Sequence, residues 1–186
     1  MTAQPRKYGN LARRYAVPFA AALLATPIAA QNQRIEVPVM TDTGESAGTV
    51  TFEQVLHGVA ISARLENLTE GAHGFHIHET GACSPDFGAA GGHYDTLGAN
   101  HGFDSSGGYH VGDLPNIYVA SDGTARADFF APHLSLAPKA ENDYPFTLSD
   151  ADGSAVMVHA QIDDYKADPA GSSGSRAACG VIVPAD

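Results

Sequence analysis

The stretch that decides the fold of this chain is Gly74-Phe75-His76-Ile77-His78-Glu79. Its residues alternate between apolar and polar, which is typical of a β-strand whose side chains point to opposite faces. His76 and His78 therefore share one face, roughly 6.5 Å apart along the strand. Two imidazoles on one face of a rigid strand provide half of a metal site. A pair of solvent-facing histidines is the alternative.

Similar short segments occur throughout the chain after Gln31, and none shows a convincing helical period. We expect strands at 34–40, 48–56, 59–65, 74–79, 116–120, 124–130, 145–148, 155–160 and 178–183. The turns at 57–58 and 121–123 predict tight hairpins, and Pro38 predicts an edge position for the first strand. This spacing predicts an all-β fold, an antiparallel sandwich or barrel, and we expect eight strands in it, one fewer than these nine segments.

Two long polar segments, 80–114 and 161–176, interrupt the strand pattern. Loops of this length inside a compact domain are usually functional or disordered. The first loop contains His93, His101, His110 and Asp113. Three imidazoles and one carboxylate suit a tetrahedral zinc ion with no open position. Four unrelated surface residues are the alternative.

A third histidine for the strand pair is His159, at the end of the segment 155–160. Copper favours several imidazoles in a planar or tetragonal arrangement. His93 is the candidate to complete a group of four, because it begins the loop set and is closest in sequence to His76 and His78. It would then bind one metal through each ring nitrogen, as a bridging ligand.

The composition limits the class of protein. A chain of 186 residues that is 44% hydrophobic is long enough for one domain with a real core. Its formal net charge of -11 argues against nucleic acid and anionic membranes as partners. The two cysteines, Cys83 and Cys179, predict a disulfide if the chain is exported, and two unrelated buried thiols are the alternative.

Residues 1–30 are interpreted as a secretory signal peptide that precedes a single domain at 31–186. The segment has a basic start, an uncharged apolar run from Ala16 to Ala30 and small residues at its end. The run is too short to span a bilayer comfortably, although a membrane anchor or a poorly ordered tail is the alternative. The pair Arg13-Arg14 weakly suggests twin-arginine export. Cleavage would remove four basic residues and no acidic ones, which moves the formal charge from -11 to -15.

Several longer motifs resemble those of the copper/zinc superoxide dismutases, in particular the exported bacterial type. They are GFHIHE, GGHYD, YHVGDLP, VMVHA, DDYK and GSRAACGVI, and they extend from residue 74 to the C-terminus. The resemblance implies a Greek-key β-barrel that converts superoxide to dioxygen and hydrogen peroxide with copper and zinc. It also implies a periplasmic or secreted location, superoxide as the small anionic partner, no membrane association of the mature form, and a possible homodimer.

Carried over residue by residue, the resemblance implies the copper ligands His76, His78, His93 and His159. It implies the zinc ligands His93, His101, His110 and Asp113, with His93 as the bridge between the metals. Cys83 and Cys179 would form the internal disulfide of the family.

The resemblance also implies roles for three further groups. Arg176 would be the active-site arginine that binds the incoming anion. His93 would take up and release a proton during the reaction. Asp163 would join a copper-binding histidine to a zinc-binding histidine and so fix their orientation. Lys166 is a candidate for steering the anion, or else a solvated surface lysine.

The sequence departs from the family pattern after His101, where it reads Gly102-Phe103-Asp104, which affects the expected path of the loop but not the predicted ligand. Three other histidines match no ligand position, namely His57, His73 and His133. We interpret them as surface or packing residues, and for His73, which lies beside the metal-binding strand, a minor role outside the ligand set stays open.

Two other functions are considered. One is a non-enzymatic periplasmic copper or zinc carrier, which needs no bridging histidine, anion-binding arginine or supporting aspartate. The other is a metallohydrolase, which needs an open zinc position and a base.

Overall fold

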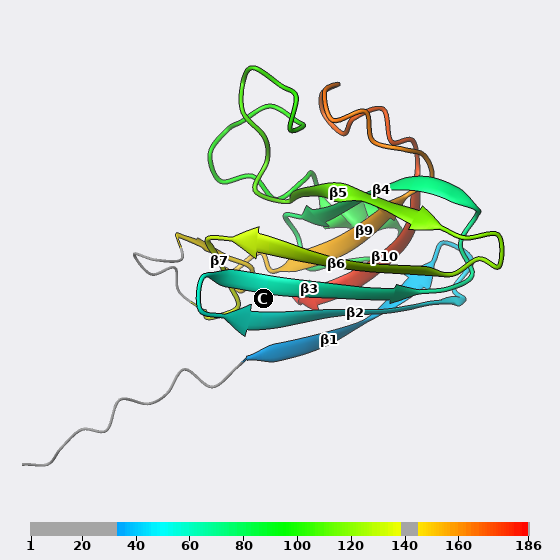
Figure 1. Cartoon of the computed structure of the whole chain (residues 1–186). Coiled ribbons are helices and arrows are strands. Elements are labelled where there is room, and N and C mark those ends of the chain that lie inside the picture. The colour runs from blue at the N-terminus through cyan, green and yellow to red at the C-terminus, as the bar shows by residue number, and fades with distance from the viewer. Residues whose placement is uncertain (1–32, 139–144, 186) are drawn as a thin grey trace, which may run out of the picture.

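The computed structural model describes residues 33–138 and 145–185. Eight antiparallel strands form one sheet in the order β5-β4-β9-β10-β1-β2-β3-β6. Their bounds are Arg34–Thr41 (β1), Ser46–Val55 (β2), Gly58–Leu65 (β3), Gly71–His78 (β4), Asp113–Val119 (β5), Ala125–Pro132 (β6), Ser154–His159 (β9) and Arg176–Val183 (β10). The end strands β5 and β6 run next to each other, so the sheet curls into a nearly closed barrel (Figure 1). The crossovers from β3 to β4 and from β6 to β9 confirm the predicted Greek-key fold class.

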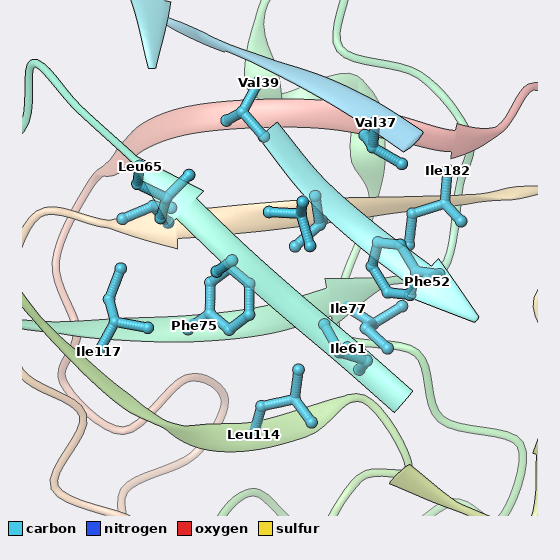
Figure 2. Packing of buried hydrophobic residues seen from close by; sticks show 14 of the residues in the cluster. Val37, Val39, Phe52, Ile61, Leu65, Phe75, Ile77, Leu114, Ile117 and Ile182 are labelled. Carbon is cyan, nitrogen blue, oxygen red and sulfur yellow. The ribbon is translucent and has the colours of Figure 1, made fainter. Parts of the chain in front are cut away.

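The strands form where apolar residues recur at every second position, since alternate side chains then point into the barrel. Val37 and Val39 of β1 and Phe52 of β2 are buried inside it with residues from other strands (Figure 2). Phe75 of β4 contacts Phe129 of β6 across the barrel, with ring centroids 5.5 Å apart. Burying each such side chain contributes about 1.5–3 kcal/mol relative to leaving it exposed.

Strands β4 and β9 are buried on both faces, unlike most of the others. Phe75 and Ile77 belong to the barrel core, whereas His76 and His78 point to the outer face. Two loops cover that outer face: residues 79–112, which include the 3₁₀ helix η1 (Phe87–Ala90), and residues 160–175. Both loops rise on the same side of the barrel, in green and orange in Figure 1. The predicted long loops are therefore present and enclose the histidine face of β4.

Three details differ from the predicted strand pattern. β1 lies between β2 and β10 rather than at an edge, but only Met40 and Thr41 pair with β10, so Pro38 interrupts no ladder there. The turn at 121–123 joins β5 to β6, which are the two ends of the sheet instead of a paired hairpin. The segment 145–148 contributes only β8 (Phe146–Thr147), which pairs with β7 (Leu134–Ser135) outside the main sheet.

The proposed signal peptide at 1–30 lies outside the described residues. Within residues 33–138 and 145–185, no helix has the length and apolar character that a membrane crossing requires.

Candidate metal centre

Four buried histidines meet on the outer face of the sheet, and we call them the four-histidine cluster: His76, His78, His93 and His159. Strand register brings three of them together, because His76 pairs with Met157 and His78 with Ala155 in β9, two and four residues before His159. The fourth, His93, comes from the first loop and forms an isolated antiparallel bridge with His78. Each histidine offers a ring nitrogen, and these nitrogens lie within 4.8 Å of one another.

One nitrogen of each ring in this cluster is buried without a hydrogen-bond partner. Within the part of the chain that the structure describes, these atoms are His76 Nδ1, His78 Nε2, His93 Nε2 and His159 Nε2. A buried polar atom without a partner carries a large desolvation cost, which a bound metal ion would remove. The donor set therefore fits a metal that prefers imidazole, such as copper.

The other nitrogen of each ring is held by the protein. His76 Nε2 lies 2.9 Å from Asp163 Oδ2, and His78 Nδ1 lies 3.1 Å from the carbonyl oxygen of Gly91. His93 Nδ1 lies 2.8 Å from Asp113 Oδ1. These contacts fix the ring orientations, as partners of metal-binding histidines generally do.

A second group, the Asp113 cluster, lies directly beside the first and contains His93, His101, His110 and Asp113. The Nδ1 atoms of its three histidines lie 2.8, 3.0 and 3.3 Å from Asp113 Oδ1. The other carboxylate oxygen, Oδ2, accepts hydrogen bonds from the backbone N–H groups of Gly102 and His110. Three imidazole nitrogens and one carboxylate oxygen fit a closed tetrahedral zinc site.

His93 belongs to both clusters, with Nδ1 toward Asp113 and Nε2 toward the four-histidine cluster. A second link is Asp163, whose Oδ2 contacts His76 Nε2 and whose Oδ1 contacts His101 Nε2, both at 2.9 Å. The carboxylate of Asp163 therefore connects one histidine of each cluster. Its own backbone N–H donates to Asn116 Oδ1, which holds the loop in place.

The surroundings of these histidines shift their pKa values in different directions. Burial lowers the pKa of His78 to about 2, of His93 to about 4 and of His159 to about 3. Burial would also lower the pKa of His101, but its hydrogen bonds to Asp113 and Asp163 outweigh this effect and raise the pKa to about 9. Neutral rings are the form that binds metals, so the four-histidine cluster is ready for a metal, whereas His101 must first lose a proton.

A cavity of about 420 Å³ opens onto both clusters, and Arg176 lies in its wall together with His78 and His159. The guanidinium of Arg176 donates hydrogen bonds to the carbonyl oxygens of Phe87 and Gly91, at the two ends of η1. The predicted disulfide between Cys83 and Cys179 is present, with Cα atoms 6.0 Å apart. It ties the loop that contains η1 to β10, which carries Arg176.

Lys166 and Phe103 lie outside both clusters. Lys166 forms an ion pair with Asp104 (2.7 Å) and does not line the cavity, so its expected steering role finds no support in its position. Phe103, from the unusual segment after His101, packs against Tyr109 and Tyr165 and so joins the two loops.

The three additional histidines do not enter either cluster. His57 and His133 are exposed. His73 is buried, and its ring nitrogens face the carbonyl oxygens of His159 (2.7 Å) and Thr69 (2.8 Å), so it is a packing residue held by the backbone.

Sequence reasoning missed the partners that hold Arg176 and the two carboxylates in the cavity wall, Glu79 and Asp95. Glu79 directly follows His78 in the strand motif, and this position beside a predicted ligand is the signal that the sequence offers for it. The carbonyl groups of Phe87 and Gly91 leave no signal in the sequence, because every residue has a carbonyl.

Comparisons with known proteins agree with this geometry. Residues 46–182 match the family model described as copper/zinc superoxide dismutase. A Cu-Zn superoxide dismutase from Caulobacter vibrioides is 44% identical over 146 residues, which cover 77% of this chain and 82% of that relative. A superoxide dismutase-like protein from Bacillus subtilis is 38% identical over 150 residues, with 79% of this chain and 74% of that relative covered.

Solved structures show the same similarity. A crystal structure of a SOD-like protein from Bacillus subtilis has a TM-score of 0.72 at 37% identity, covering 79% of this chain and 97% of that one. The Cu/Zn superoxide dismutase from Brucella abortus has a TM-score of 0.65 at 32% identity, covering 81% and 99%. With the family match over most of its length, the chain belongs to the copper/zinc superoxide dismutase family, oxidoreductases that dismutate superoxide with copper and zinc as cofactors.

Proposed function

We propose that the four-histidine cluster holds copper, that the Asp113 cluster holds zinc, and that His93 bridges the two metals. The observation that carries this proposal is the position of His93, which offers Nε2 to one cluster and Nδ1 to the other. Copper, when bound, supplies the one-electron oxidation and reduction by which two superoxide ions become dioxygen and hydrogen peroxide. Zinc at a closed site supplies structure and tunes the shared ring.

Arg176 is proposed to bind the anion at the mouth of the site. Its guanidinium is always charged and offers more N–H donors than its two carbonyl partners accept. Among the described residues that line the cavity, it is the one arginine or lysine, and Glu79 and Asp95 are also present there. The incoming superoxide would therefore orient on Arg176 and turn toward His78 and His159.

His93 Nε2 is proposed to take up a proton when it is released from copper, and to give that proton up when it binds copper again. With Nδ1 on zinc, a proton at Nε2 makes the ring neutral, so burial does not oppose it. Asp163 would keep His76 and His101 oriented throughout, since it accepts from both. Hydrogen peroxide needs two protons, and His93 Nε2 would supply one of them.

A metal carrier remains the rival function, and three features favour the enzyme over it. A carrier gains nothing from a histidine shared between two sites, from an arginine held by two carbonyl groups, or from a carboxylate that locks a ligand of each site. A metallohydrolase is disfavoured because the Asp113 cluster already offers four ligands.

We propose that the chain is exported, with residues 1–30 as a signal peptide and 31–186 as the mature domain in the periplasm or outside the cell. The disulfide supports an oxidising compartment. The acidic charge supports a mature protein without nucleic acid or membrane partners. Sequencing the N-terminus of the protein in an osmotic-shock fraction tests this, and an intact N-terminus in the cytoplasmic fraction would contradict it.

A homodimer is also proposed, with contact through an apolar groove of about 650 Å³ beside the first loop. Leu97, Phe103, Tyr109 and Phe130 line it, and all four are large exposed apolar residues. Apolar patches of this kind often mark protein interfaces. Light scattering should give twice the chain mass for the wild type and a lower mass for Tyr109→Asp, and a monomeric wild type at micromolar concentration would refute the dimer.

Metal analysis combined with a superoxide decay assay tests the central proposal. The purified protein should hold one copper and one zinc per chain and should accelerate superoxide decay. His93→Ala should weaken the retention of both metals, whereas His110→Ala should weaken zinc retention alone. A fully metal-loaded protein without activity would favour the carrier function. A His93→Ala protein that loses only one metal would refute the proposal that His93 bridges the two sites.

A further inference from the structure

One carboxylate outside both clusters contacts the first loop at His101, a proposed zinc ligand. Asp168, in the second loop, accepts a hydrogen bond from the backbone N–H of His101 at 2.6 Å through Oδ1. Its other oxygen, Oδ2, accepts from the side-chain amide of Asn100. Asp168 is exposed and lies in none of the potential metal groups. A surface carboxylate thus holds two consecutive residues of the other loop.

With these contacts, both the ring and the backbone around His101 are held by hydrogen bonds. The ring is held by Asp113 Oδ1 at Nδ1 (3.0 Å) and by Asp163 Oδ1 at Nε2 (2.9 Å). The backbone is held by Asp168 at the N–H of His101 and by Asp113 at the N–H of Gly102. Asp168 and Asp163 both come from the second loop, so this loop holds His101 at the ring and at the backbone.

The next part of the interface shows that the two loops meet closely here. The backbone of Gly102 approaches Tyr165 so tightly that a Cβ atom at Gly102 would lie 2.1 Å from the carbonyl oxygen of Tyr165. The N–H of Asp104 donates to that same oxygen at 3.0 Å. The contacts of Asp168 therefore belong to a packed interface between the loops.

We infer that Asp168 is a positioning residue for zinc, acting through the backbone of His101. This inference rests on the proposed zinc site. Asp168 anchors the peptide that presents His101, so that its Nδ1 stays aimed at the position between His93, His110 and Asp113. Without this anchor, the ring keeps its contact with Asp163, but its Cα is free to shift, and zinc should escape more often.

A matched control is available in the same loop. Asp164 is also exposed, and its Oδ1 accepts from the N–H groups of Lys166 and Ala167, both at 2.8 Å. It stabilises a turn of its own loop and does not reach the first loop through these bonds. Asp164→Asn and Asp168→Asn therefore make the same chemical change at neighbouring carboxylates with different partners.

The test measures the rate at which the zinc-loaded, copper-loaded protein releases zinc to a chromogenic chelator. Asp168→Ala should release zinc about tenfold faster than the wild type, the lower end of the effect of losing a supporting contact to a metal ligand. Asp168→Asn should release zinc at a rate between those of the wild type and Asp168→Ala, because its amide oxygen can still accept the hydrogen bond from the N–H of His101. Asp164→Asn should match the wild type. The visible bands of Co²⁺ bound in place of zinc should change in Asp168→Ala and not in Asp164→Asn.

Two results would overturn the inference. One is zinc release from Asp168→Ala at the wild-type rate. The other is equal acceleration of copper and zinc release together with a lower melting temperature of the metal-free protein, because a general loss of loop structure would act on both sites. A wild-type protein that retains no zinc would refute the proposed zinc site itself, which separates the two failures.

Discussion

Replacing Arg176 with isoleucine should slow superoxide decay by about one to two powers of ten. Arg176 lies in the wall of the cavity beside His78 and His159, and two carbonyl groups of the first loop fix its guanidinium. The variant loses one charge-assisted contact to the anion, which is worth about 1.5–3 kcal/mol. At about 1.4 kcal/mol per factor of ten, this range gives the expected loss.

The assay is superoxide decay followed by pulse radiolysis or stopped flow, with copper and zinc content measured in the same preparation. Arg176→Lys is the matched control, because it keeps the charge but loses the planar fork that binds two carbonyl groups. It should retain more activity than Arg176→Ile. Measurements at low and high ionic strength separate the contact from long-range attraction, which salt screens. Unchanged activity in a metal-replete Arg176→Ile protein would refute the reasoning and reopen the carrier function.

The remaining predictions concern the disulfide and the Asp113 cluster. Replacing Cys83 and Cys179 with serine opens a link across 96 residues, and should reduce the unfolding free energy by about 4–5 kcal/mol in the chain-entropy model; an unchanged denaturant midpoint would contradict this. Zinc binding to the metal-free protein at pH 7 should release a proton, because the pKa of His101 is raised to about 9 and the ligand must be deprotonated. Zinc affinity should therefore increase with pH up to about pH 9. Titration calorimetry in buffers of different ionisation enthalpy measures this, and no proton release would show that His101 is already neutral.

The fold was accessible from the sequence because barrel strands have a simple period. Alternation along 34–40, 48–56 and 59–65 identified β1, β2 and β3, since each buries every second side chain. The segment 145–148 shows the limit of this reasoning. It has apolar residues, but Phe146 and Thr147 pair with β7 outside the barrel, and no local pattern shows which sheet a strand joins.

The candidate site was accessible to a similar degree. Histidines at alternate strand positions and in one glycine-rich loop are rare enough to suggest metal clusters, and the structure brings the residues predicted as ligands close together. The positions of Lys166 and Asp168 were not accessible. Both are charged residues in the same polar loop, and only the loop path decides that Lys166 pairs with Asp104 while Asp168 reaches His101. Loop paths depend on long-range packing, which the local sequence does not encode.

The two buried faces of β4 have a consequence for how this protein can change during evolution. One residue inserted into or deleted from the stretch 75–78 would exchange the faces of every residue beyond it. Phe75 or Ile77 would then enter the metal layer, and an imidazole would enter the apolar barrel core. Substitutions can test either layer separately, but a change of length alters both at once. We therefore expect length variation among relatives to be tolerated in the two covering loops and to be absent from β4.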